Sequence, residues 1–259
     1  MKNNKVIYTS LVGKQDQLIS PKIIYDDFDY ICFSNDISTS KKIGVWNIRS
    51  IPYSNPDDTR LSRYVKLNPH LVLPEYEYSI WIDANIEIID TTLKEQTLNL
   101  IKSSSKIANV KHPWSNCIYD DIYECIYRVK DKIPTLISQY KFLIAEGYPI
   151  KNGLYENGLI FRKHKDEEVI SISNNWWKIY TQYSKRDQLS LCYVYWKHHF
   201  TPDLLLPEDK NLRNHAGFKY HKHKLSFKKK IIRELKKTRN RLLLKVYYSK
   251  KYFQNICNR

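Results

Sequence analysis

The sequence is poor in glycine and contains no glycine-rich phosphate loop. Only 6 of its 259 residues are glycine. Neither GxxxxGK[ST] nor GxGxxG occurs, which excludes the backbone-amide cradles of P-loop and dinucleotide-binding proteins. A bound phosphate would therefore depend on side chains and a metal ion.

Three further absences concern the compartment. The five cysteines form no CxxC pair and are odd in number, which argues against a disulfide framework or a structural zinc site and favours a reducing cytoplasm. No segment approaches the roughly 20 apolar residues that cross a bilayer. The first residues, MKNNKVIYTS, lack the apolar stretch of a signal peptide. We therefore expect a cytoplasmic protein.

The net charge of +16 is distributed unevenly along the chain. Residues 222–259 contain 14 Lys or Arg and a single acid, Glu234, whereas residues 1–221 have a net charge of only +3. The sequence therefore predicts two parts, a nearly neutral domain over 1–221 and a basic helical tail over 222–259.

Within 1–221, short β-rich runs alternate with helix-like segments, which is typical of an α/β fold with a mostly parallel central sheet flanked by helices. Strands are predicted at 5–9, 30–34, 43–48, 79–88, 106–112 and in 152–164. Helices are predicted from Pro56 to about 68, at 92–102, on both sides of Pro134, at 167–180 and at 187–196.

The apolar run SIWIDANIEI turns polar at Asp83, followed two residues later by Asn85. Ligands of open α/β sheets bind at such strand ends, and two oxygen donors at this spacing can face one hard cation. The triplet is close to the DxD motif by which sugar-nucleotide transferases hold Mn²⁺ or Mg²⁺ on a diphosphate. An Asx turn at the end of the strand explains the triplet equally well.

Arg60, Arg63 and Lys66 are spaced three apart on the preceding predicted helix. Such spacing forms a slowly drifting ridge, so these cations can converge on one phosphate. Taken alone, the same pattern is more often a solvated helix face. The absence of a phosphate loop elsewhere favours the binding role.

Ser184 and Asp187 have the spacing of a capping box before LSLCYVYW. That cap places Arg186, Asp187 and Gln188 on a first helical turn, where side chains can point into a cleft. The capping role and a catalytic role are compatible.

Two histidines, a lysine and the pair Glu156–Asn157, a carboxylate followed by an amide, supply further candidates. His215 could complete a metal shell begun at Asp83, and Lys219 could reach a leaving phosphate. His112 follows a predicted strand, and Glu156 precedes one. Each has an ordinary alternative as a loop, turn or surface residue. Trp114 and the pair Trp176–Trp177 could stack on a sugar or base, although we expect at least one of the pair to be packed inside.

Several of these motifs occur in an order that resembles a known family. W-I-D-A-N-I is followed by H-P with I-Y-D-D, then by G-L-x-E-N-G-L-I-x-R-x-H, W-W and R-D-Q-L-S-L. This order resembles the glycosyltransferase-like family catalogued as domain of unknown function 616, over roughly residues 5–199. The resemblance implies a GT-A fold, with a nucleotide-binding sheet and a metal at its DxD-like strand end.

A more distant similarity is to glycosyltransferase family eight. By this similarity Asp83 and Asn85 match the DxD positions, and Asp187 with Gln188 match the D-Q pair beside the reacting sugar. His215 matches the family's late metal histidine only loosely, because H-A-G is one residue shorter than H-x-x-G. His221 is the substitute for that ligand.

We therefore expect a metal-dependent glycosyltransferase that moves a sugar from a nucleoside diphosphate donor, UDP-linked, to a cell-surface polysaccharide or lipid-linked glycan. Asp83, Asn85 and His215 would hold Mn²⁺ or Mg²⁺. Asp187, Gln188 and Glu156 would orient the sugar or act as base or nucleophile. The remaining donor-binding candidates are Tyr8, Thr9 and Asp36 at the nucleobase, and Arg60, Arg63, Lys66, His112, Arg186 and Lys219.

The tail reads as a basic amphipathic helix. Plotted at 100° per residue, an apolar stripe comprises Ile231, Ile232, Leu235, Leu242, Val246 and Phe253. Basic residues lie opposite, namely Lys229, Arg233, Lys236, Lys237, Arg241 and Lys251. This pattern favours attachment to the anionic inner face of the cell membrane. The alternatives for the tail are a helix packed on its own domain or a partner, and a nucleic-acid-binding segment. For the protein as a whole, Asn85 in place of a second Asp leaves a non-catalytic glycan-binding relative as another alternative.

Overall fold

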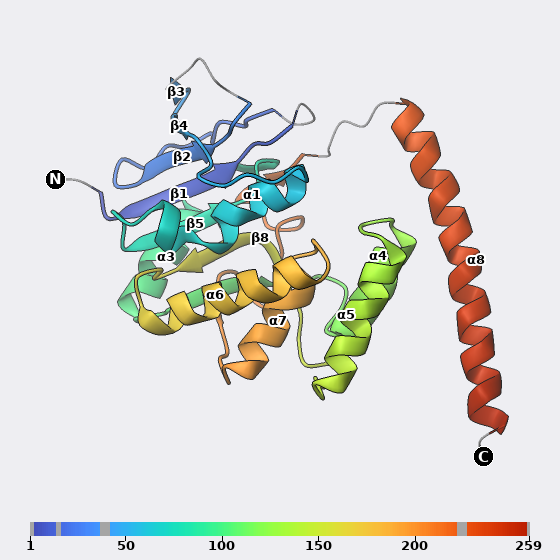
Figure 1. The fold of residues 1–259 in the computed structure, drawn as a ribbon. Coiled ribbons are helices and arrows are strands. Elements are labelled where there is room, and N and C mark those ends of the chain that lie inside the picture. The colour runs from blue at the N-terminus through green and yellow to red at the C-terminus, as the bar shows by residue number, and fades with distance from the viewer. Residues whose placement is uncertain (1–2, 14–16, 37–41, 222–226, 258–259) are drawn as a thin grey trace.

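The structure is a computed structural model that describes residues 3–13, 17–36, 42–221 and 227–257, with the side chains of the last helix described over 230–245. The main sheet of this described part has the strand order β3-β4-β2-β1-β5-β8-β7-β9 (Figure 1). Its strands are β1 (Lys5–Ser10), β2 (Asp29–Phe33), β3 (Lys42–Ile43), β4 (Trp46–Arg49), β5 (Tyr78–Ile82), β7 (Ile107–Lys111), β8 (Tyr155–Arg162) and β9 (Asp203–Leu204).

The central strands alternate their side chains between two cores. Val6 and Tyr8 of β1 contact one core, whereas Ile7 between them contacts the other. All three are fully buried, because helices or loops cover both faces of the sheet. The sheet is mixed: β1, β2, β4 and β5 run parallel, and β8 is antiparallel to β5 and β7. The predicted α/β class is confirmed.

Helices lie on both faces of the sheet (Figure 1). The first core contains residues of α1 (Asp58–Leu67), α2 (Pro69–Val72), α4 (Ile118–Tyr127), α5 (Ile133–Ala145), α6 (Glu167–Gln182) and α7 (Gln188–Lys197). The second core contains residues of α3 (Thr92–Lys102). Helix α1 begins as Pro56 and its neighbouring acids predict, since the Asp57 carboxylate caps it by accepting bonds from the N–H groups of Thr59 and Arg60.

Three local predictions need correction. The predicted strand 43–48 is a hairpin, because Gly44 adopts a left-handed φ of 57° and turns β3 back on β4. The predicted strand 79–88 divides at Asp83 into β5 and β6 (Ile86–Ile88), and β6 pairs with β10 (Phe218–Tyr220) in a separate sheet. Ser184 is not a cap, since its hydroxyl donates to Asp131 and α7 begins after Asp187.

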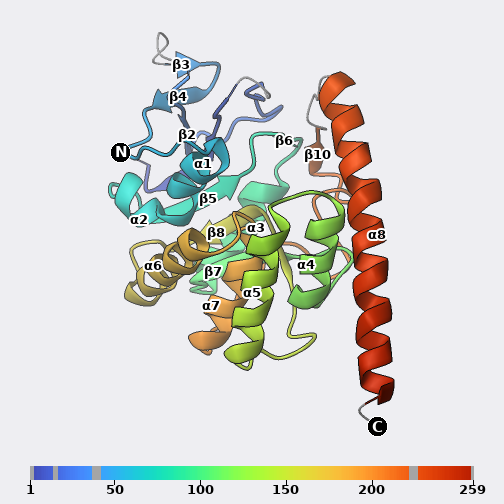
Figure 2. The same cartoon turned by 45° about the vertical axis from the view of Figure 1, so that its right-hand side comes forward.

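The basic tail forms one long helix, α8 (Phe227–Cys257), which lies beside α4 in both views (Figures 1 and 2). Its contact with the domain includes a buried side chain, Asn240, whose Nδ2 donates to the carbonyl of Ile126 at 2.7 Å. Leu244 also packs against the first core. Over the described residues, none of the helices has the length and apolar content required to span a membrane.

Candidate functional site

Sheet topology brings residues distant in sequence to the end of β5. Asp83 follows β5 directly, and its N–H donates to the carbonyl of Gly158 at 2.8 Å. Because β8 is antiparallel to β5, with Ile82 opposite Leu159, the first residues of β8 lie at the carboxyl end of β5. Glu156 and Asn157 therefore reach the same place as Asp83, although more than 70 residues separate them.

A cavity of about 560 Å³ opens at this point. That volume lies within the usual range for a small-molecule site. Its walls come from α1, α4, the start of β8, the start of α7 and the loop before β10. The predicted site residues that line it are Arg63, Lys66, Asp83, His112, Glu156, Arg186, Asp187 and Gln188.

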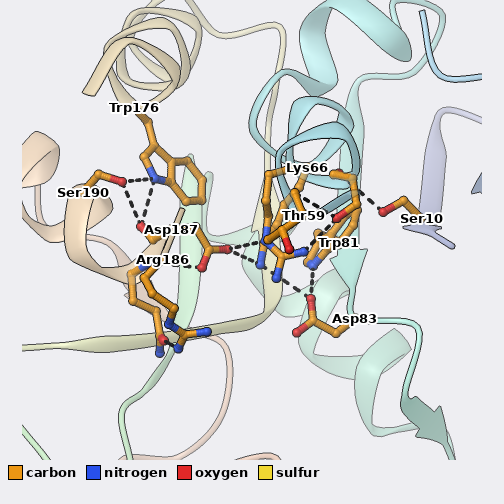
Figure 3. A network of polar contacts seen from close by, with 12 residues as sticks. Ser10, Thr59, Lys66, Trp81, Asp83, Trp176, Arg186, Asp187 and Ser190 are labelled. Carbon is orange, nitrogen blue, oxygen red and sulfur yellow. Dashed lines mark hydrogen bonds and ion pairs between the residues drawn. The ribbon is translucent and has the colours of Figure 1, made fainter. Parts of the chain in front are cut away.

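Lys66 is the centre of the charge arrangement in the cavity (Figure 3). Its side chain is 1% exposed, and its Nζ lies 2.5 Å from Asp187 Oδ2 and 3.5 Å from Asp83 Oδ1. The ammonium also lies 5.2 Å from the centre of the Trp81 ring. Burial lowers the pKa of Lys66, while the two carboxylates oppose that change. The predicted ridge on α1 thus points inward at this position.

Asp187 is a buried carboxylate surrounded by cations. Its Oδ2 also lies 3.2 Å from Arg63 Nε, and its Oδ1 accepts a bond from the N–H of Gln188 as the N-cap of α7. Burial alone would raise the pKa of Asp187, but Lys66, Arg63 and Arg186 hold it well below its usual range. The group is therefore ionised at any physiological pH and is a weak base.

Asp83 presents its carboxylate to the cavity. Its Oδ1 accepts a hydrogen bond of 2.8 Å from Trp81 Nε1, and its side chain is 29% exposed (Figure 3). Trp81, a residue of the first core, thus also orients this carboxylate. The open oxygen fits a cation that takes its other ligands from a diphosphate and water, the usual arrangement for Mg²⁺.

The other predicted metal ligands are not placed beside Asp83. Asn85 donates through Nδ2 to the carbonyl of His221 at 2.8 Å and does not line the cavity. His215 accepts a bond from the N–H of Gly217, and His221 contacts Glu87 at 2.8 Å. In the described part of the chain, no three His, Cys, Asp or Glu side chains are grouped to hold a metal. Of the predicted metal ligands, Asp83 is the one that lines the cavity.

Five predicted donor-binding residues also lie outside the cavity lining. The Arg60 guanidinium donates to the carbonyls of Tyr180 and Tyr183 at the end of α6, because the helix leaves those groups unpaired. Tyr8 and Thr9 are buried in β1, and burial raises the pKa of Tyr8 to about 12. Asp36 accepts a hydrogen bond from the Gly13 N–H, and Lys219 is a largely exposed residue of β10.

Glu156 and Gln188 are held by polar contacts at the cavity wall. The Glu156 carboxylate accepts bonds from the N–H of Leu212, at 2.9 Å, and from Arg213. Gln188 donates to the carbonyl of Tyr155 at 3.2 Å and accepts a bond from Arg186. One charged and one neutral donor thus fix the orientation of the Glu156 carboxylate.

Asn157 is the most unusual polar group in the cavity lining. The residue is 3% exposed, yet neither its Oδ1 nor its Nδ2 has a hydrogen-bond partner among the described residues. An unpaired buried amide costs about 1–3 kcal/mol. A ligand that brings its own donors and acceptors, such as a sugar with free hydroxyls, would satisfy both atoms.

Trp114 and Arg213 form the rim of the cavity together with His112. The Arg213 guanidinium lies 4.9 Å from the ring centres of both Trp114 and Tyr220. His112 contacts the Trp114 ring edge-on, and burial lowers the pKa of His112, so its imidazole is neutral at pH 7. Trp114 was a predicted stacking platform. Arg213 was missed, because it lies in an irregular loop with no spacing pattern.

Residues 6–222 match the model of the TOD1/MUCI70 glycosyltransferase-like domain, which covers most of the chain. The chain therefore belongs to that family. This confirms the expectation of a glycosyltransferase-like domain at the level of the family, and such a domain implies sugar substrates in general.

Among solved structures, the chain is similar to the apo structure of the WbbM bifunctional glycosyltransferase, with 11% sequence identity and a TM-score of 0.44. That match covers 92% of this chain and 44% of the WbbM chain, so this chain spans less than half of that protein. No curated protein gave a significant match.

Proposed function

We propose that this protein is a metal-dependent glycosyltransferase. It would move a sugar from a nucleoside diphosphate donor, UDP-linked, to a cell-surface polysaccharide or lipid-linked glycan. The observation that carries the proposal is the arrangement of Asp83, Lys66 and Arg63 at the carboxyl end of β5, in a chain of a glycosyltransferase-like family. Ligands of α/β sheets bind at such strand ends.

The cations of α1 are suited to a departing diphosphate. When the bond between the anomeric carbon and the phosphate oxygen breaks, negative charge grows on the diphosphate. Lys66 and Arg63 are already fixed by Asp187 and need no reorganisation to stabilise that charge. A divalent cation, Mn²⁺ or Mg²⁺, bound to Asp83 together with the donor phosphates would supply further positive charge at the leaving group.

The acidic residues of the site have positioning roles in this proposal. Asp187 is ionised and weakly basic, so it orders Lys66 and Arg63 rather than accepting a proton. Glu156 is held by Arg213 and the N–H of Leu212. Both carboxylates therefore set the shape and charge of the cavity in which the donor sugar is oriented.

Asn157 would contact the sugar directly. Its buried amide has both a donor and an acceptor to offer, and sugar hydroxyls pair with both. Its loss should therefore weaken binding of a nucleotide sugar more than binding of the nucleoside diphosphate alone. This difference separates a sugar-binding role from a general effect on the cavity.

The test is a screen of UDP, GDP and CMP sugars for thermal shift and donor turnover, with and without Mn²⁺ or Mg²⁺. We expect UDP-sugar turnover that requires the metal. Asp83→Asn keeps an acceptor for Trp81 but removes the charge, and it should lower turnover by about 100-fold or more. Asn157→Ala should weaken binding of the UDP-sugar and leave binding of UDP nearly unchanged.

Asp209→Asn is the matched control, because Asp209 has a highly exposed carboxylate outside the cavity. It should leave turnover and metal dependence unchanged. Metal-dependent turnover that survives Asp83→Asn would overturn the metal assignment. If no nucleotide sugar binds or is turned over, the glycosyltransferase proposal is wrong and a non-catalytic glycan-binding protein is favoured.

A further inference from the structure

Helix α8 contacts the domain along one line of side chains. Arg233, Lys237, Asn240 and Leu244 are partly or fully buried, at spacings of four, three and four residues. Residues so spaced lie on one side of a helix. Asn240 is 2% exposed and bonds the carbonyl of Ile126, so this line defines the side of α8 that faces α4.

The apolar side chains of α8 lie on the opposite side. At 100° per residue, their mean direction is about 160° away from the line that faces the domain. They are Ile231, Ile232, Leu235, Leu242 and Leu243, with exposed fractions of 46%, 42%, 67%, 60% and 51%. These five are one third of the large apolar residues exposed over the whole described chain, so their concentration on a single helix is not the usual scatter.

Cations border this apolar face. At 100° per residue, Lys236 lies at one edge of it and Lys245 at the other, and Arg239 interrupts it. The single acid of the tail, Glu234, pairs with Lys237 at 2.6 Å, so residues 222–259 keep a large excess of basic over acidic side chains. The face therefore combines exposed aliphatic side chains with a strongly positive surround.

We propose that this face of α8, Ile231–Leu243 with its bordering cations, docks on the surface of an anionic lipid bilayer. The helix would lie in the plane of the interface, with aliphatic side chains among the acyl chains and cations at the lipid phosphates. The predictions for Val246, Lys229, Lys251 and Phe253 concern side chains outside the described residues. The five described apolar side chains are sufficient to define the face.

The positive charge and the aliphatic side chains of this face together favour a bilayer over a second copy of the chain or a nucleic acid. A second copy of the chain would bring two strongly positive helices together, and like charges oppose that pairing. Nucleic acid would use the cations, but its phosphates gain nothing from five exposed aliphatic side chains. An anionic bilayer is complementary to both parts of the face.

Docking of α8 on a bilayer has a consequence for the cavity, and this consequence rests on the proposed function. Helix α4 packs against α8, and its residues Asp121, Glu124 and Cys125 line the cavity. A docked α8 would therefore hold the cavity beside the membrane, where a lipid-linked acceptor is found. Membrane binding itself does not depend on catalytic activity and is tested without it.

The experiment is cosedimentation of the full chain with vesicles of phosphatidylcholine, alone or with about one third phosphatidylglycerol. We expect binding to the anionic vesicles that weakens at high salt. The double variant Leu235→Ser, Leu242→Ser should lower the partition coefficient about tenfold or more, because it removes apolar area without changing charge. Lys236→Gln with Lys245→Gln should reduce binding to anionic vesicles only.

The matched control is Leu71→Ser with Ile150→Ser, which removes two aliphatic side chains with exposed fractions of 57% and 72% elsewhere on the domain. It should bind vesicles like the wild type, and circular dichroism should show equal folding of all variants. The proposal is overturned if anionic vesicles are not bound, or if the two-leucine variant binds them as well as the wild type. It is also overturned if those leucines prove to hold a dimer together in solution.

Discussion

The cavity and α8 both contain many cations, but they handle them in opposite ways. In the cavity, Lys66 is buried, Arg63 is partly buried, and both contact the carboxylate of Asp187. On α8, the cations among the described side chains are mostly exposed, and the helix contains one acid, Glu234. The same residue types thus serve two purposes: fixed charges at a reaction site, and a positive surface.

The two regions differ in the free-energy cost of losing one charge of an ion pair, because burial raises that cost. Removing one partner of a buried ion pair leaves an uncompensated charge in a poorly solvated place, which is strongly destabilising. An exposed pair is worth about 0–1 kcal/mol, because water and salt screen it. Charge substitutions should therefore be costly in the cavity and nearly silent for stability on α8.

The largest expected effect comes from Lys66→Met. This change leaves the buried carboxylate of Asp187 without its closest cation, and we expect the free energy of unfolding to fall by about 3–5 kcal/mol. Urea denaturation followed by circular dichroism measures it. Lys236→Met on α8 is the matched control, with an expected change within about 0.5 kcal/mol. Equal losses from the two variants would refute the contrast between the regions.

The second largest effect concerns a buried titratable group, His164, which lies outside both regions. His164 is fully buried, and burial lowers its pKa to about 4, while its Nε2 bonds the carbonyl of Leu73. The unfolded chain binds a proton here below about pH 6.5, so stability should fall as the pH drops from about 6.5 to 4, by up to about 3 kcal/mol. His164→Gln cannot titrate and should flatten this part of the curve.

Unfolding free energies of the wild type and His164→Gln, measured at intervals between pH 7 and pH 4, decide this point. The difference between the two proteins should shift in favour of the variant as the pH falls. A constant difference over the whole range would mean that His164 does not couple folding to protonation.

The smallest expected effect concerns the attachment of α8. Asn240→Ala removes the buried hydrogen bond to Ile126, which should weaken docking of the helix by about 1–2 kcal/mol. Hydrogen exchange in residues 230–245 should become faster, while the exchange of β1 and β5 stays unchanged. Thr238→Ala, at an exposed position of the same helix, is the control. Unchanged exchange in the Asn240 variant would show that α8 is held by other contacts.

Much of the fold was predictable because it depends on local sequence patterns. The helix 92–102, the strand 107–111 and the start of α1 after Pro56 follow from periodicity and capping residues. The errors occurred where one residue overrides the pattern. Gly44 turned a predicted strand into a hairpin, since only a residue without Cβ readily adopts its left-handed φ.

The candidate site was predictable only in part. Spacing indicated that Arg60, Arg63 and Lys66 form a ridge, yet the structure directs Arg60 to the end of α6 and the other two to the cavity. The spacing places the three cations on one side of the helix, but the segments packed against that side determine which cation contacts a carboxylate and which contacts carbonyl groups. The roles of these residues in binding and catalysis stay predictions.

The sequence by itself determined the α/β class, the strand end at Asp83 and the charge asymmetry of the tail, because these depend on residue type and short-range spacing. Only the tertiary structure decided that β8 runs antiparallel to β5, which brings Asn157 to Asp83, and that Asp187 meets Lys66. It also decided which side of α8 faces solvent. Contacts between distant segments depend on chain topology and burial, and neither is encoded in any local pattern.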